Sequence, residues 1–234
     1  MGLPMTEPRP IRKLTVALRA MLIANLCVML LVGIGYGLHA MAASRLSPGE
    51  YLVSLDGFDG SELADLVLTC SGLMAIPVGL ICGFLALKWS YRSNQNAHVF
   101  ARGGENTPKW AIWWWFIPFA CLFKPYAVMS EVWRSAIEPD RWKGLKDPVL
   151  LRWWWAAHIV SGMTSGAGSA LERSSVTAGQ VFASDLISLL FVLIQVASTL
   201  LYLRVIGRIE PLQTALIAQG RRRPEDTGVP SWAP

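Results

Sequence analysis

Four long apolar blocks constrain the fold of this chain more than any other feature of its sequence. They cover residues 14–41, 63–91, 150–170 and 182–206. Each is close to the length of about 20 residues that a helix needs to cross the hydrocarbon core of a bilayer. Because backbone amides inside hydrocarbon must find partners within their own segment, these blocks are predicted to be helices. The sequence therefore predicts an all-α integral membrane protein with four transmembrane helices.

The composition supports this prediction. The chain is 53% hydrophobic and 16% charged, with a mean hydropathy of +0.40, whereas about 25% of the residues of a soluble domain are charged. The first block also resembles a secretory signal, because Ala40-Met41-Ala42 fits a cleavage site. Its apolar core, residues 20–38, is longer than the about 7–15 residues of a signal. We therefore expect an uncleaved first membrane helix.

The segment 108–139 departs from the pattern of the four blocks. It is rich in tryptophan, and Pro118 and Pro125 break any continuous helix across it. Lys124 would lie near hydrocarbon depth if the segment crossed the membrane, which is costly. We expect two short helical pieces, near 109–117 and 126–137. This proline-broken segment is predicted either to lie in the membrane interface or to dip into the bilayer as a re-entrant element.

The basic residues are distributed very unevenly. Nineteen of the 21 Lys and Arg residues fall at the N-terminal end, between 88 and 152, or at the C-terminal end, and only Arg45 and Arg173 fall elsewhere. An excess of Lys and Arg marks cytoplasmic loops, so both termini are predicted to be cytoplasmic. The net charge of +5 is assigned to these loops and not to nucleic-acid binding.

The expected organisation has three parts. A flexible cytoplasmic tail covers 1–13, a membrane domain covers 14–210, and a cytoplasmic C-terminal tail covers 211–234. Within the membrane domain, the polar stretch 93–109 is predicted to be a loop. Pro211 is predicted to break the helical stretch that follows the last span.

Tryptophan is the strongest candidate signal for function, because ten of the 11 lie between Trp89 and Trp155. Indole rings favour the headgroup region of a membrane, so they indicate interfacial anchors or an aromatic groove that holds a lipid or a partner helix. Glu131 and Arg134 are spaced to pair on a solvated helix face. The candidate interface or lipid groove comprises Trp110, Trp113, Trp114, Trp115, Pro118, Lys124, Pro125, Tyr126, Glu131, Trp133, Arg134, Trp153 and Trp154.

The sequence carries none of the common catalytic or metal-binding motifs. The four cysteines have no C-x-x-C spacing, and there is no nucleophile elbow, zinc-protease helix or phosphate loop. A haem between His39 and His158 is conceivable, but no C-x-x-C-H motif supports it. We therefore predict a protein that is not an enzyme and has no catalytic, metal or cofactor site. Small residues at helical spacing, such as Gly79 and Gly83, instead predict close helix packing within the chain, in a homo-oligomer or with a partner membrane protein.

The central segment resembles a known family. Its pieces are Pro108-Lys109-Trp110, Trp114-Trp115-Phe116-Ile117-Pro118-Phe119, Lys124-Pro125-Tyr126, Met129, Glu131-Val132-Trp133-Arg134 and Trp153-Trp154. Their order and spacing resemble the bacterial domain of unknown function 4328 family. The resemblance implies a multi-pass protein of the bacterial inner membrane, and it carries over no catalytic residue because the family has no established activity. The resulting hypothesis is a non-enzymatic module that binds lipid or partner membrane proteins. The alternative is a small transporter or channel subunit with a re-entrant segment.

Overall fold

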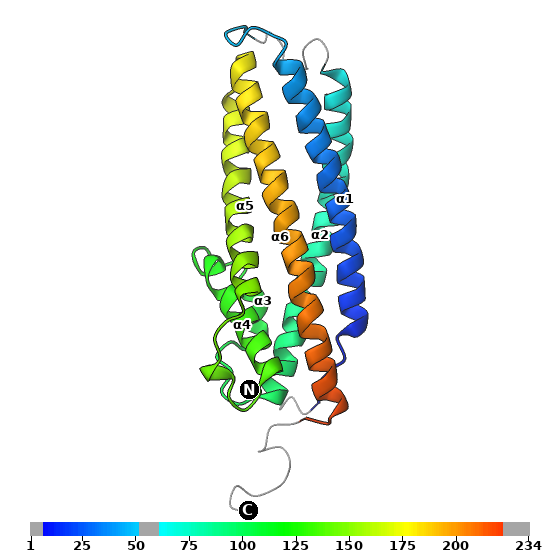
Figure 1. Cartoon of the computed structure of the whole chain (residues 1–234), viewed down its shortest axis with the longest axis vertical. Coiled ribbons are helices and arrows are strands. Elements are labelled where there is room, and N and C mark those ends of the chain that lie inside the picture. Colours follow the sequence, from blue (N-terminus) through cyan, green and yellow to red (C-terminus); the bar gives the residue numbers. More distant parts are fainter. Residues whose placement is uncertain (1–6, 52–60, 222–234) are drawn as a thin grey trace, which may run out of the picture. The chain divides into compact units, whose positions relative to one another are not determined.

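The computed structural model describes residues 7–51 and 61–221, and most of them are helical (Figure 1). The apolar blocks are confirmed as long helices, while two shorter α-helices and two 3₁₀ turns lie between the second and third of these. The described elements are α1 (Arg12–Ala43), α2 (Glu62–Phe100), α3 (Pro108–Trp113), η1 (Ala120–Leu122), α4 (Lys124–Ile137), η2 (Trp142–Gly144), α5 (Val149–Ser174) and α6 (Ala178–Ala218). The expected pieces near 109–117 and 126–137 correspond to α3 and α4.

Three of the long helices, α1, α2 and α6, are long and apolar enough to cross a membrane. α5 is not among them, because it contains Arg152, His158 and a run of Ser and Gly residues after Val160. The described residues therefore support a membrane protein with three candidate spans. The fourth span remains a prediction.

The chain divides into two compact units, which we call unit 1 and unit 2. Unit 2 comprises residues 21–82 and 154–201, and so contains parts of all four long helices. Its helices meet at small residues: a Cβ on Gly35 would lie 2.7 Å from the side chain of Leu68, and one on Gly33 would lie 3.2 Å from Val192. Glycine at such positions lets helix backbones approach closely.

The outer surface of unit 2 is apolar. Large aliphatic side chains such as Leu73, Leu80 and Leu193 are exposed there, as expected for helices whose outer faces contact lipid. The glycines that were expected to pack are divided between two roles. Gly33, Gly35 and Gly168 contact other helices, whereas Gly79 and Gly83 face open space within the described part of the chain.

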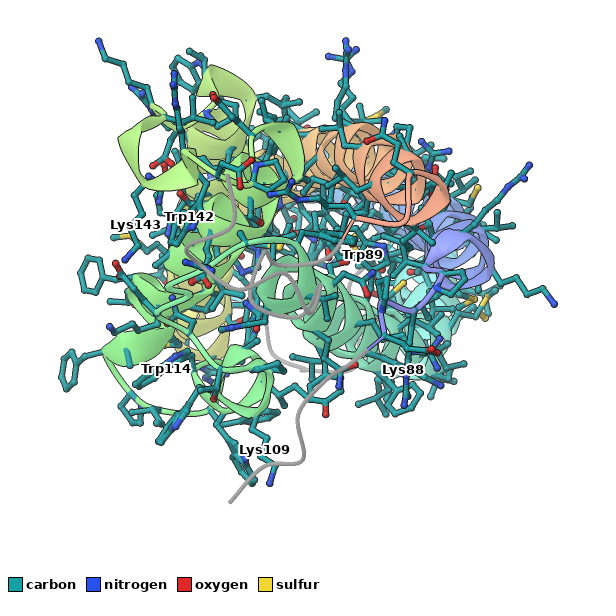
Figure 2. The ribbon with its side chains drawn as sticks, turned by 90° about the horizontal axis from the view of Figure 1, so that it is seen from below. Lys88, Trp89, Lys109, Trp114, Trp142 and Lys143 are labelled. Atoms are coloured by element: carbon teal, nitrogen blue, oxygen red, sulfur yellow. The ribbon has the colours of Figure 1, made fainter. Side chains whose placement is uncertain are left out.

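Unit 1 comprises residues 1–20, 83–153 and 202–234, of which 7–20, 83–153 and 202–221 are described. It has a conventional buried core that includes Trp89, Phe100 and Ile206. Polar side chains are part of this core. The Trp89 indole N–H donates to the Thr15 hydroxyl at 2.9 Å, in the middle of the view in Figure 2.

Two predicted boundaries are wrong, both within unit 1. α2 continues to Phe100 through the start of the polar stretch that was expected to be a loop. Asn96 in this stretch is buried and bonded: its Nδ2 donates to the backbone oxygen of Arg9 at 2.9 Å and to Gln213 Oε1 at 3.1 Å. α6 likewise continues through Pro211 to Ala218, because burial of Ile209 and Gln213 outweighs the lost proline hydrogen bond. The predicted C-terminal tail, 211–234, is therefore helical as far as Ala218, and its residues 222–234 lie outside the described residues.

Candidate functional site

A surface of aromatic side chains covers α3 and η1. Pro108 begins α3 at its first position, where a missing backbone N–H costs nothing. Pro118 and Pro125 then limit the chain to short turns before α4. Short turns cannot bury many large side chains, so several rings stay exposed. We call these exposed residues the aromatic surface: Trp110, Trp113, Phe116, Phe119 and Phe123.

Two lysines lie beside these rings. Lys109 and Lys124 are both exposed, and the Lys124 ammonium lies 5.2 Å from the centre of the Trp114 ring. Trp114 in turn stacks on Trp110, with ring centres 4.5 Å apart. Figure 2 shows Lys109 and Trp114 on the same lobe of unit 1. A cation near an aromatic face is stabilised by the ring quadrupole. This part of unit 1 therefore combines apolar rings with positive charge.

Phe119 is held in an unusual backbone conformation. Its φ is 61°, a value that few residues other than glycine adopt. Its side chain is also 82% exposed, so no buried contact compensates for the strain. Strain of this kind costs about 1–3 kcal/mol and is concentrated at functional sites. The conformation therefore favours a role for the outward-facing ring.

A polar pocket with a volume of about 180 Å³ lies between α4 and the segments on either side of it. Seven of its nine lining residues have polar or charged side chains. Its lining residues are Glu105, Asn106, Tyr126, Ala127, Ser130, Glu131, Arg134, Trp142 and Asp147. Three of the predicted site residues, Tyr126, Glu131 and Arg134, are thus brought together here.

Asp147 organises one side of the pocket. Its carboxylate accepts hydrogen bonds from the Tyr126 hydroxyl at 2.8 Å and from the Ser130 hydroxyl. Burial alone would raise the pKa of Asp147, but these hydrogen bonds and the charges of Arg134 and Arg152 outweigh it and lower the pKa. Burial and the bond to Asp147 raise the pKa of Tyr126 to about 12, so Tyr126 stays a donor at neutral pH.

Arg134 is held on the same side. Its Nε lies 3.4 Å from Asp147 Oδ1, and its Nη1 donates to the Leu145 backbone oxygen at 3.2 Å. The guanidinium also lies over the ring of Trp142, which Lys143 approaches as well; Figure 2 shows Trp142 and Lys143 close together. The predicted pairing of Arg134 with Glu131 is wrong, because the Asp147 carboxylate takes the guanidinium.

Glu131 forms the other side of the pocket and is only 3% exposed. The prediction that it lies on a solvated face is therefore wrong. Its Oε2 accepts hydrogen bonds from the backbone N–H of Asn106 at 3.2 Å and from the Asn106 side chain at 3.0 Å. Residues near 106 fold over α4 to supply these donors. His98 lies 3.8 Å from Oε1.

The remaining predicted site residues are dispersed. Trp133 is buried on α4, whereas Trp153 is exposed at the start of α5. Trp154 belongs to unit 2, where it packs against Trp155 and His158. The structure therefore does not gather the predicted aromatic residues into one groove. Sequence reasoning missed Asn106, Trp142 and Asp147, which lie in connecting segments without any recognisable motif.

Unit 2 contains a second cluster of ionisable groups. His39 Nδ1 lies 2.8 Å from Asp185 Oδ2, and His39 Nε2 lies 3.8 Å from Asp65 Oδ1. The Asp185 side chain is buried, and the pair joins α1 to α6. Within residues 7–51 and 61–221, no three His, Cys, Asp or Glu side chains are grouped as a metal site requires.

The model of a family described as a domain of unknown function (DUF4328) matches residues 55–211. The chain belongs to the DUF4328 family. This match covers most of the chain, confirms the resemblance found in the sequence, and includes the aromatic surface and the whole polar pocket. The matched residues include Lys109 and Phe119 at the aromatic surface, and Tyr126 and Glu131 in the pocket. No curated protein and no solved structure matches the chain.

Proposed function

We propose that this DUF4328 protein is a four-span protein of the bacterial inner membrane, and that unit 2 is the part embedded in the bilayer. The helical segments in unit 2 are residues 21–43, 62–82, 154–174 and 178–201. At 1.5 Å per residue each is about 31–36 Å long, close to the about 30 Å thickness of the hydrocarbon core. The matching length of the α5 segment supports its inclusion as the fourth span.

The division of charge supports cytoplasmic termini. Unit 1 contains nineteen of the 21 Lys and Arg residues, whereas unit 2 contains only Arg45 and Arg173. Basic residues concentrate on the cytoplasmic side of a membrane protein. Unit 1 is therefore the cytoplasmic part in this proposal, and its exposed Trp110 and Trp113 lie at the headgroup level of the inner leaflet.

Reporter fusions test this topology. A cytoplasmic reporter fused after Lys146 is expected to be active, and a periplasmic reporter inserted after Arg45 is expected to be active as well. Periplasmic activity of a fusion at Lys146 would overturn the topology.

We further propose that the protein acts as a non-enzymatic module that binds anionic lipids through the aromatic surface. The exposure of these rings beside Lys109 and Lys124 carries the proposal. Rings of this kind partition into the headgroup region, and a lysine near the inner leaflet gains about 1 kcal/mol from anionic lipids. Charge complementarity thus supports an anionic lipid surface as the occupant.

Hydrogen exchange of the full chain in nanodiscs tests the lipid proposal. We expect residues 108–123 to exchange more slowly in nanodiscs with phosphatidylglycerol than in nanodiscs of phosphatidylcholine alone. The double variant Lys109→Gln with Lys124→Gln should lose most of this difference. Lys146→Gln, an exposed lysine of the connector before α5, is the matched control and should keep it.

Native mass spectrometry of the same samples gives a second measurement. The wild-type protein should retain several-fold more phosphatidylglycerol than the double variant, and the masses also report any second copy of the chain. Equal exchange in the two lipids together with equal lipid retention would contradict the proposal. A transporter or channel role remains an alternative, which ion flux through proteoliposomes would test.

A further inference from the structure

The polar pocket of unit 1 has an imbalance of charge that its own residues do not correct. Three carboxylates line it, from Glu105, Glu131 and Asp147, against the single guanidinium of Arg134. Asp147 and Arg134 are paired with each other. The pocket is therefore left with the charges of Glu105 and Glu131.

Glu131 is the decisive residue, because it is buried. Among the described residues no Lys or Arg forms an ion pair with it, and both of its hydrogen-bond donors belong to the neutral Asn106. The nearby His98 directs its Nε2 proton to the backbone oxygen of Asn106 at 2.8 Å, since a carbonyl can only accept. Glu131 Oε1 thus has no hydrogen-bond donor in this part of the chain.

His98 Nε2, at 3.8 Å from Oε1, is too far away to donate a hydrogen bond to it. A buried carboxylate without a hydrogen-bonded cationic partner is energetically costly. A ligand with a positive charge and N–H donors would satisfy both deficiencies of Glu131 at once. The pocket volume of about 180 Å³ is many times the ~10–15 Å³ that one water molecule requires by the same measure. This space, which is partly open to solvent, admits a small amine.

We propose that the polar pocket binds a primary ammonium group of about the size of ethanolamine, with Glu131 as its counter-ion. A quaternary ammonium such as choline has no N–H to donate to Oε1 and is larger, so the pocket discriminates against it. The ammonium has two sources, a phosphatidylethanolamine headgroup or a free small amine. The lipid source rests on the proposed function, whereas binding of the free amine does not.

Calorimetric titration of the full chain in phosphatidylcholine nanodiscs tests the free-amine arm, with ethanolamine as the probe and choline as the comparison. We expect ethanolamine to bind at least tenfold more tightly than choline. Glu131→Gln keeps the size of the side chain and should weaken ethanolamine binding at least tenfold. Glu138→Gln, at the end of the same helix and outside the pocket, is the matched control and should bind as the wild type does.

Ala127→Leu provides a second route to the same question. Ala127 lines the pocket without carrying charge, so a larger side chain fills the space and should block ethanolamine while leaving the carboxylates in place. This variant keeps the proposal testable if Glu131→Gln fails to fold. Absence of ethanolamine binding to the wild type, or equal binding by all variants, overturns the pocket proposal.

Native mass spectrometry from nanodiscs of mixed lipids tests the lipid source. Enrichment of phosphatidylethanolamine that is lost in Glu131→Gln but kept in Lys109→Gln with Lys124→Gln supports the headgroup as the ligand. Enrichment lost only in the lysine variant overturns it, because the lipid then binds the aromatic surface. The lysine variant should still bind free ethanolamine. Its binding would show that the pocket is intact even if the proposed lipid function of the aromatic surface fails.

Discussion

Unit 1 and unit 2 place their polar and apolar side chains in opposite positions. Unit 1 buries polar groups such as Asn96 and Gln213 in hydrogen-bonded networks, and it exposes Lys and Arg. Unit 2 exposes aliphatic side chains and joins its helices at small residues such as Gly35. The same long helices contribute to both units, so the polarity of their exposed side chains changes along their length. A polar stretch in the sequence of such a chain can therefore be a helix that is buried in protein, and not only a loop.

The difference is sharpest for the two buried carboxylates. Asp185 of unit 2 pairs with an ionisable partner, His39, at 2.8 Å. Among the described residues, Glu131 of unit 1 accepts hydrogen bonds only from the neutral Asn106, and the ionisable His98 lies farther away, at 3.8 Å. Because Asp185 has its partner within the chain, a structural role is favoured for it. An incompletely satisfied carboxylate beside a pocket favours a binding role in unit 1.

The largest expected effect concerns the pair in unit 2. Removing one partner by His39→Ala should lower the free energy of unfolding by about 3 kcal/mol, because Asp185 loses its main partner while it stays buried. Replacing both residues by leucine should cost much less, because no unpaired charge remains. Unfolding in detergent titrations measures both, with Met41→Ala on the exposed face of α1 as control. Equal losses in the single and double variants would show that the pair is not coupled.

Two glycines compare how tightly the units are packed. A Cβ on Gly104 of unit 1 would lie 2.3 Å from the His98 ring and 2.6 Å from Glu131, so Gly104→Ala should cost about 2 kcal/mol. A Cβ on Gly35 of unit 2 would lie 2.7 Å from Cδ2 and Cγ of the single side chain of Leu68, so Gly35→Ala should cost less, about 1 kcal/mol. Gly144→Ala and Gly37→Ala have open space and serve as controls. Thermal unfolding gives the order, and a larger cost at Gly35 would reverse the comparison.

Asp147 of unit 1 should contribute to the loss of folding stability at low pH. The pKa of Asp147 is lowered in the folded protein, so its ionised form contributes stability above the pKa of the unfolded chain, and this contribution is lost as the pH falls through the folded value. Asp147→Asn should therefore destabilise the protein at pH 7 by about 1–2 kcal/mol and flatten its stability below about pH 4. Thermal unfolding between pH 3 and 7 measures this. An unchanged pH profile would mean that Asp147 does not contribute to it.

The smallest expected effect separates strain from lipid contact at Phe119. Phe119→Gly should raise the free energy of unfolding by about 1 kcal/mol, because glycine adopts the positive φ without strain. The same variant should weaken the binding of anionic lipid, because it removes an exposed ring. Phe119→Ala is the control that removes the ring without relieving the strain. Stabilisation by alanine as large as that by glycine would argue against backbone strain.

The long helices could be predicted because membrane helices need uninterrupted apolar residues, and the apolar blocks supply them. Their ends could not be predicted where burial by distant residues decides. Ser93 and Asn96 continue α2 because Arg9 and Gln213, far away in the sequence, bond to this stretch. The uneven distribution of Lys and Arg along the sequence matches the division into units, because nineteen of these 21 residues belong to unit 1.

The candidate site could be predicted only in part. Trp110 and Trp113 of the aromatic surface were among the predicted site residues, whereas its three phenylalanines were not, because the tryptophans alone were treated as the signal. Tyr126, Glu131 and Arg134 were identified, but their partners were not. Asp147 and Asn106 reach the pocket from connecting segments. No local sequence pattern predicts which carboxylate forms an ion pair with Arg134.

The modest hydropathy of α5 has a consequence for biosynthesis if α5 is the fourth span. A segment with so many Ser and Gly residues leaves the translocon for lipid less readily than its apolar neighbours do. α6 follows after residues 175–177 and offers a partner, because Ser161 donates to Gln195 at 2.6 Å and Gly168 accommodates Ser188. We expect α5 and α6 to enter the bilayer together as a helical hairpin, so a nascent chain that stops before α6 would leave α5 outside the lipid.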